Sequence, residues 1–157
     1  IIFFSIMRGR PVTEDELFAR RPLGMRMAMV VRQWRAIIDS AITDTGLTQS
    51  SWTVLMQLHQ LGDNVSVSEL AEVQGIELPP LMRTLSLLEK QGYLVRIRLL
   101  TLTAEGRAIL EKLSCVIETY QECVTQTIPE ADLATFSATL NQIACRLRNI
   151  REEDNKI

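Results

Sequence analysis

The fold follows from residues 66–102, which begin Ser66-Val-Ser-Glu-Leu-Ala-Glu-Val-Gln-Gly75-Ile-Glu-Leu-Pro-Pro80-Leu-Met-Arg83 and end Gly92-Tyr-Leu-Val-Arg96-Ile-Arg98-Leu-Leu-Thr-Leu102. Ser66 opens a capping-box sequence, and Gly75 supplies the left-handed residue that ends a short first helix. A second helix begins near Leu78 and ends at Gly92. Two helices joined by a tight turn are the usual form of the helix-turn-helix, whose second helix enters the major groove of DNA. We therefore expect a DNA-reading unit here.

The second helix of this pair has one apolar and one polar side. Leu81, Leu85 and Leu88 recur at helical spacing and form the expected core stripe. Arg83 lies on the other side, where a guanidinium can reach guanine O6 and N7 or a phosphate. We predict DNA contacts from Arg83 and from the polar or turn residues near it, which are Ser66, Ser68, Pro79, Pro80, Arg83, Thr84, Arg96 and Arg98.

Several of these residues also have a purely structural explanation. Ser66 is accounted for as a helix cap, and the two prolines suit a first turn, where a missing N–H costs little. Arg98 also serves as a strand-edge charge that discourages aggregation. The charge distribution favours DNA binding, because the whole chain has a net charge of −2 whereas residues 78–100 hold four basic residues against Glu89, a balance of +3.

Helices are expected before this unit. Thr13-Glu-Asp-Glu16 is a capping box that opens a short helix, and a long helix follows from about Leu23 to Thr43. The predicted buried stripe of the long helix is Met27, Val31, Trp34, Ile38 and Ala41. Thr48 caps the next helix, which runs to about Leu61. In the first helix of the central pair, the residues expected to face inward are Leu70, Ala71 and Val73.

Two strand-like segments, Tyr93–Val95 and Leu99–Leu102, precede two further helices. The first helix is expected from Ala104 to Thr127, with an apolar set of Ile109, Leu113, Val116, Tyr120 and Val124. The second runs from about Glu130 to Arg151. Its heptad seam is Leu133, Phe136, Leu140, Ile143, Leu147 and Ile150. Such a seam packs within one chain or between two chains, and we favour contact between chains for this terminal helix.

Composition argues against several other classes of protein. The apolar residues Ile1–Met7 are too short to span a bilayer and lack signal-peptide features, so they form either an arm or a piece preceding Met7. The three cysteines, Cys115, Cys123 and Cys145, have no paired spacing, which predicts a reducing cytoplasm and small buried side chains. One histidine, without a cluster of ligands, predicts no metal and no cofactor. No pattern for catalysis is present, so we do not expect an enzyme.

The order of these elements resembles the winged helix-turn-helix regulators of the MarR family. Fragments resembling its SlyA branch are Pro22-Leu-Gly24, Val31-Arg-Gln-Trp34-Arg-Ala36 with Ile38-Asp39, Leu47-Thr-Gln49 through Trp52, Leu58-His59-Gln60-Leu61, Gly75-Ile-Glu77, Arg83-Thr-Leu85 and Leu102-Thr103. The resemblance covers about residues 22–150 and rests on the order and spacing of these fragments.

This resemblance implies a homodimer that binds a pseudo-palindromic operator. Each subunit would place its recognition helix in the major groove and its wing near the minor groove, with half-sites about one helical turn, or ~10 base pairs, apart. Many members release DNA when a small phenolic or aromatic acid binds between the dimerisation and DNA-reading lobes. Candidates for such a pocket are Met29, Arg32, Trp52 and His59, for which plain packing between the lobes is the alternative.

The wing departs from the family pattern. The family has a hairpin with an Asp-x-Arg or Asp-Arg-Arg tip, whereas Tyr93 to Thr103 contains no Gly, Asn, Asp or Pro between its strand-like halves. We therefore expect that ordinary turn chemistry cannot close a hairpin here. About ten residues near Arg96–Ile97 would be either deleted or left out of the written sequence. A true deletion puts minor-groove reading in doubt.

The sequence thus predicts a mainly helical (α+β) fold with an incomplete wing. A single MarR-type domain would cover residues 1–157, with dimerisation helices at 1–45 and 104–157 and a winged helix-turn-helix lobe at 48–102. The predicted function is a cytoplasmic, homodimeric DNA-binding transcriptional regulator that a small aromatic or phenolic ligand releases, without membrane association. The alternatives are a protein–protein adaptor or a small-molecule-binding protein on the same frame.

Overall fold

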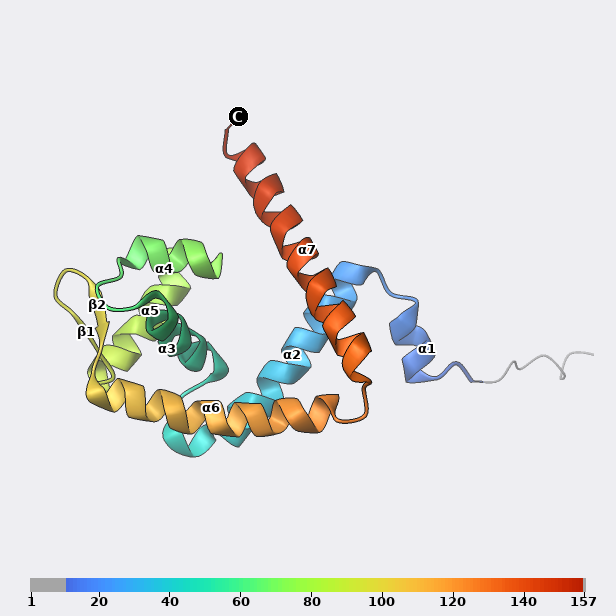
Figure 1. Cartoon of the computed structure of the whole chain (residues 1–157), viewed down its shortest axis with the longest axis horizontal. Coiled ribbons are helices and arrows are strands. Elements are labelled where there is room, and N and C mark those ends of the chain that lie inside the picture. Colours follow the sequence, from blue (N-terminus) through green and yellow to red (C-terminus); the bar gives the residue numbers. More distant parts are fainter. Residues whose placement is uncertain (1–10, 157) are drawn as a thin grey trace, which may run out of the picture. The chain divides into compact units, whose positions relative to one another are not determined.

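The computed structural model describes residues 11–156, so the predicted roles of Ile1–Met7 lie outside the described residues. The helices are α1 (Glu14–Ala19), α2 (Leu23–Ala41), α3 (Gln49–Leu61), α4 (Val67–Gln74), α5 (Leu78–Lys90), α6 (Ala104–Thr125) and α7 (Glu130–Asp154), with a 3-10 turn η1 at Thr43–Thr45 (Figure 1). The strands are β1 (Leu94–Arg96) and β2 (Leu100–Leu102). The chain divides into two compact units, one ending at Leu110 and the other beginning at Glu111. The predicted fold class, mainly helical with a small winged sheet, is confirmed.

Side-chain caps and glycines set the helix ends where the sequence predicts them. Thr13 accepts a hydrogen bond from the Glu16 N–H at 3.2 Å, and the Glu16 carboxylate accepts one from the Thr13 N–H at 2.9 Å. Ser66 caps α4 by accepting from the Glu69 N–H at 3.1 Å. Gly75 then adopts the left-handed conformation, with φ of 63°, which a side chain would disfavour. These local bonds fix the entry to α4 and the turn that leads to α5.

The core of the first unit is built on the leucine stripe of α5. Leu81, Leu85 and Leu88 are all fully buried, as predicted, and α5 contacts α3, α4 and β1. Burying one leucine side chain stabilises a fold by roughly 1.5–3 kcal/mol, so this stripe anchors the second helix firmly. The polar side of α5 is thereby held outward on a rigid element.

Two predicted core residues that precede the wing are instead exposed, and both predictions were wrong. Val31 is 52% exposed, because α2 becomes buried only from Ile38, near its junction with α3. Val73 is 51% exposed, because Leu70 and Ala71 already occupy the inward face of the short helix α4. Val73 lies about 200° around the helix from Ala71, so these two side chains cannot share one buried face.

The wing closes as a hairpin, which corrects the prediction that it cannot. β1 and β2 pair antiparallel, with Leu94 opposite Leu102 and Arg96 opposite Leu100. The connection is residues 97–99, and none of them has a positive φ. The strands are therefore joined without the glycine or asparagine that a two-residue turn requires. Val65 extends the sheet on the other side of β2, because its N–H and C=O both bond to Leu100, at 3.2 and 2.7 Å.

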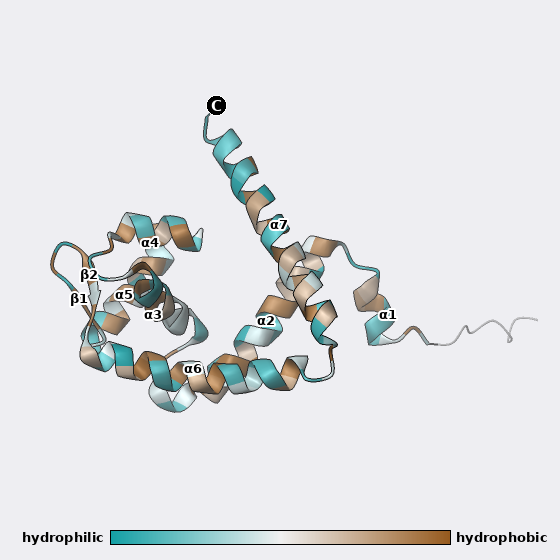
Figure 2. Ribbon diagram, viewed as in Figure 1, coloured by the Kyte–Doolittle hydropathy of each residue, from teal (hydrophilic) through white to brown (hydrophobic). Residues whose placement is uncertain are grey.

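The apolar residues of the last two helices are only partly buried. In α6 the buried stripe is Leu110, Leu113 and Ile117, whereas the predicted Tyr120 and Val124 are 38% and 55% exposed. No residue of α7 is buried, although apolar residues recur along it (Figure 2). The three cysteines, predicted to be buried, are free and exposed, which is a further correction. Cys115 and Cys123 lie on the solvent-exposed side of α6, and Cys145 lies on α7, of which no residue is buried.

Candidate nucleic-acid interface

The start of α5 is shaped by a short turn and two prolines. Gly75 leads from α4 into the turn, and the Ile76 N–H donates to the Ala71 C=O at 3.2 Å. Pro79 and Pro80 follow in the first turn of α5, where neither needs an N–H donor, and both are exposed. Thr84 is half-buried, and its hydroxyl donates back to the Pro80 C=O at 3.3 Å.

Arg83 is placed on the outer side of α5, as its spacing predicts. Its side chain is exposed and forms no ion pair with any residue between 11 and 156. The buried leucines on either side of it in sequence fix the direction of the helix. A free guanidinium on a rigid helix has the donor geometry that suits a guanine edge or a phosphate.

The two predicted serines at the start of α4 differ in whether the hydroxyl already has a hydrogen-bond partner. Ser66 is half-buried and already occupied as the N-cap of α4. Ser68 is exposed in the first turn of the same helix, where a hydroxyl can donate to a phosphate. The structural explanation of Ser66 therefore holds, and Ser68 is the freer donor of the two.

Arg96 ties the wing to α5. One guanidinium nitrogen lies 3.1 Å from a carboxylate oxygen of Glu89, and another lies 3.6 Å from the sulfur of Met82. Glu89 and Met82 both belong to α5, so Arg96 links the hairpin to that helix. Arg98, in the connection between the strands, is exposed. Next to it, Ile97 is 88% exposed, so the tip of the wing presents an apolar and a basic side chain together.

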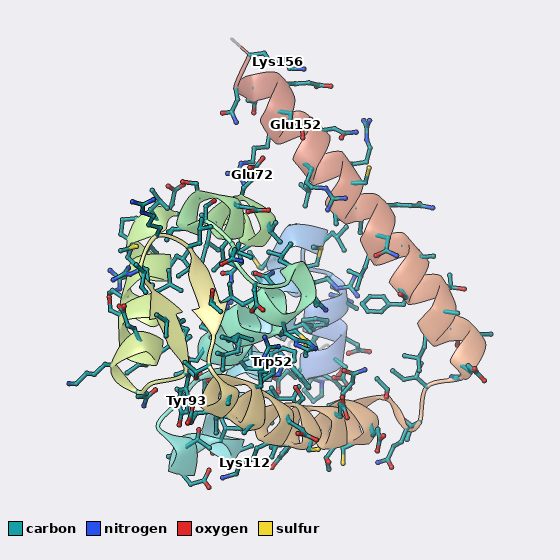
Figure 3. The ribbon with its side chains drawn as sticks, turned by 60° about the vertical axis from the view of Figure 1, so that its left-hand side comes forward. Trp52, Glu72, Tyr93, Lys112, Glu152 and Lys156 are labelled. Carbon is teal, nitrogen blue, oxygen red and sulfur yellow. The ribbon has the colours of Figure 1, made fainter. Side chains whose placement is uncertain are left out.

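Acidic residues limit where a phosphate backbone can approach. Glu69 and Glu72 are exposed on α4, and Glu77 is the exposed N-cap residue of α5 without a side-chain cap bond (Figure 3 labels Glu72). Each carboxylate weakens phosphate attraction nearby through charge repulsion. These carboxylates therefore disfavour a phosphate beside α4 and the start of α5, whereas the exposed cations Arg83 and Arg98 favour one.

Gly106, in the first turn of α6, lies against the base of the wing, a structural role that was not predicted from the sequence. A Cβ at this position would lie 1.9 Å from the Tyr93 carbonyl oxygen. Thr103 fastens the same junction, because its N–H donates to the Tyr93 C=O at 3.1 Å and its hydroxyl donates to the Gly92 C=O at 2.6 Å. Figure 3 shows Tyr93 beside the start of α6. A glycine in the first turn of a helix signals such a close backbone approach.

A cavity of about 360 Å³ opens within the first unit, against α5. Its lining residues are Arg35, Gln49, Ser50, Thr53, Val54, Gln57, Gln74, Ile76, Pro80 and Thr84. None of the four predicted ligand residues lies on it. Met29 is half-buried and accepts from an Arg21 nitrogen at 3.3 Å, Trp52 is half-buried, and Arg32 and His59 are exposed. Their role as a ligand set stays a prediction.

No group of three or more His, Cys, Asp and Glu side chains between residues 11 and 156 is arranged to hold a metal ion. Over the same residues, none of the helices combines the length and the apolar character that crossing a membrane requires.

Comparisons with known proteins agree with this geometry. A model of the MarR family matches residues 45–99, which span α3 to the wing. The crystal structure of the transcriptional regulator PA3341 matches this one with a TM-score of 0.71. The two sequences are 29% identical, and the match covers 82% of this chain and 99% of that chain. The MarR-family protein Rv2887 of Mycobacterium tuberculosis, solved in complex with DNA, is 26% identical, with a TM-score of 0.66, over 78% of this chain and 98% of that one.

A third structure shows the same fold at lower identity. A MarR-family transcriptional regulator from Rhodococcus sp. RHA1 is 22% identical, with a TM-score of 0.73, over 78% of this chain and 93% of that chain. The matches extend across nearly the whole of these proteins, so the shared architecture includes the helices outside the wing and its helix pair. Residues 45–99 thus match the model of the MarR family, and the chain shares its winged-helix fold with the MarR-family regulators compared above.

Proposed function

We propose that the protein is a homodimeric regulator that binds a pseudo-palindromic operator through α5. The observation that carries this proposal is the exposed Arg83, free of ion pairs among the described residues, on a helix whose opposite face is fully buried. A relative with the same fold has been solved bound to DNA, which supports duplex DNA as the partner. In the proposed complex Arg83 reads a base edge, while Ser68 and Arg98 contact phosphates.

A second copy of the chain is the proposed partner of α7. This helix is about 37 Å long, and no residue on it is buried. Its seam leaves Phe136, Leu147 and Ile150 exposed by 60%, 58% and 49%. An apolar seam at heptad spacing that stays open in one chain is what helix pairing between two chains requires. Two-fold symmetry would then set two recognition helices about one turn of DNA apart.

The short wing implies a reduced role in reading the minor groove. Strands of this length extend only ~10 Å beyond their base, and Arg96 is engaged by Glu89. We therefore assign most of the specificity to α5, and to the wing a supporting contact through Arg98. The exposed Ile97 at the wing tip is the observation that favours the adaptor alternative, in which the wing docks on another protein.

The remaining parts of the proposal follow from the resemblance. We include a SlyA-like mode of action, a non-enzymatic role in the cytoplasm, and release from DNA by a small phenolic or aromatic acid. Affinity should depend steeply on salt, because neutralised phosphates release counterions.

The experiment that tests the proposal selects bound sites from random DNA duplexes and measures their affinity by gel shift. A recovered palindromic site whose affinity falls steeply with salt supports a dimeric operator-binding regulator. The adaptor alternative predicts recovery of no common site and no shift of duplex DNA above background. Repeating the titration with a phenolic acid present then tests ligand release separately.

A further inference from the structure

One leucine of α5 stands on the exposed side of the helix. Leu87 is 38% exposed, and it follows Arg83 by four residues, so it lies only about 40° from Arg83 around the helix. The buried Leu85, by contrast, lies about 200° from Arg83. Leu87 therefore belongs to the face that carries Arg83, and not to the leucine stripe that packs in the core.

Two cations border Leu87 along the same face. Arg83 precedes it by one helical turn, and Lys90, which is also exposed, follows it by three residues. The acidic residue of α5 is Glu89, which lies about 200° around the helix from Leu87. Its carboxylate is held by the Arg96 guanidinium of the wing at 3.1 Å. The outer stripe of α5 thus joins two positive charges to one apolar side chain and contains no carboxylate.

The major groove of DNA offers a specific partner for such a side chain. Only thymine projects a methyl group into this groove, whereas the other base edges present chiefly hydrogen-bond donors and acceptors. A contact between leucine and this methyl group removes apolar surface of both from water, which is favourable. Against a polar base edge, the same leucine would displace hydration without returning a hydrogen bond. An exposed leucine in the major groove therefore favours thymine over the other three bases.

We propose that Leu87 reads the 5-methyl group of a thymine in each half-site of the operator. This inference rests on the proposed DNA-binding function and adds one base-reading residue to it. Leu87 lies about 6 Å from Arg83 along the helix axis, which corresponds to about two base-pair steps of ~3.4 Å. The half-site should therefore contain a thymine within about two base pairs of the base that Arg83 reads.

The backbone that carries Leu87 is fixed on two sides. Leu85 and Leu88 are fully buried against the rest of the first unit. The ion pair between Arg96 and Glu89 attaches the same half of α5 to the wing. A side chain on a backbone that is already ordered loses less conformational freedom on binding than one on a mobile segment. Most of the free energy of the methyl contact should therefore appear as affinity.

Replacing thymidine with deoxyuridine tests the contact directly, because the two differ only in the 5-methyl group. The full chain is titrated in a gel shift against its selected operator, with the thymines replaced one at a time. We expect one position in each half-site where the replacement weakens binding about fourfold, and about fifteenfold when both half-sites are changed, because a methyl group is no longer buried. Absence of such a position within about two base pairs of the one that Arg83→Ala relaxes overturns the inference.

Matched variants assign the methyl contact to one side chain. Leu87→Ser should bind the thymine operator about fourfold more weakly than the unmodified protein and bind the deoxyuridine operator equally well, so that the deoxyuridine penalty disappears. Leu87→Met keeps an apolar side chain and should keep the penalty. Leu61→Ser is the control, because Leu61 is 40% exposed but lies on α3, and it should leave the penalty unchanged. A full penalty in Leu87→Ser, or its loss in Leu61→Ser, overturns the assignment.

The outcomes separate this inference from the proposed function. If selection from random duplexes returns no common site, the regulatory function fails and the reading of thymine fails with it. If a site is recovered and Arg83→Ala relaxes it, but no deoxyuridine penalty depends on Leu87, the regulator stands and this inference fails. A penalty that Leu87→Ser abolishes and Leu87→Met keeps supports both.

Discussion

Replacing Gly106 with alanine tests the junction between the wing and α6. The added Cβ would lie 1.9 Å from the Tyr93 carbonyl oxygen, whereas ordinary contacts begin near 3.4 Å, so the two backbones must separate by well over an ångström. That movement breaks both Thr103 bonds to the wing, at 3.1 and 2.6 Å. A net loss of about 1 kcal/mol per hydrogen bond and about 1–3 kcal/mol of overpacking strain outweighs the better helix propensity of alanine.

We therefore expect Gly106→Ala to lower the free energy of unfolding by about 2–4 kcal/mol. Urea denaturation followed by circular dichroism measures this change. The matched control is Gly24→Ala, because nothing lies within 4 Å of a Cβ at Gly24 and its φ is not in the left-handed range. That change should be neutral or stabilise the protein by up to about 1 kcal/mol. A Gly106→Ala protein as stable as Gly24→Ala would refute the close approach.

Three further substitutions test the core, the wing and the helix seam. Leu85→Ala should cost about 2–5 kcal/mol in urea denaturation because its side chain is fully buried, whereas Leu87→Ala, 38% exposed, should cost much less; equal losses would contradict the orientation of α5. Glu89→Gln removes the partner of Arg96, and we expect it to change the free energy of unfolding by less than about 1 kcal/mol. The freed arginine should tighten DNA binding and steepen the slope of log binding constant against log salt concentration by up to ~1. An unchanged slope would argue against a contact between this arginine and a phosphate. Leu147→Asp should convert a dimer into monomer in sedimentation equilibrium at micromolar concentration, and an unchanged dimer would exclude the α7 seam as the interface.

Much of the helix arrangement was predictable because its signals are local. Ser66 and Gly75 mark the two ends of α4 through bonds that span only a few residues, and the structure contains both. The stripe of Leu81, Leu85 and Leu88 predicted the buried side of α5, because one strongly amphipathic helix has a single way to face a core.

The wing and the exposed valines were mispredicted for different physical reasons. The absence of turn residues excludes a two-residue turn, but it does not exclude the connection at 97–99, which needs no positive φ. Val31 matches a helical stripe, yet periodicity gives the direction of a side chain and not whether another element covers it. The same limit applies to the seam of α7, which the sequence identified and which stays open in one chain.

The cavity had no sequence signal at all. Arg35, Gln57, Gln74 and Thr84 come from four different helices, and no local pattern relates their spacing. Only the packing of α2 against α3, and of α3 and α4 against α5, brings them to one surface. The predicted ligand set rested on one face of α3, on two residues of α2 and on a family resemblance, and it stays a prediction.

The measurement that tests the central claim most directly is the operator affinity of Arg83→Ala in a gel-shift titration, with Arg32→Ala as the control. Arg83 and Arg32 are both exposed arginines, but only Arg83 lies on α5. We predict that Arg83→Ala loses about 1–3 kcal/mol of binding free energy and relaxes the preference at one base position, while Arg32→Ala binds as the unmodified protein does. Unchanged affinity and unchanged base preference in Arg83→Ala would contradict DNA reading by this helix.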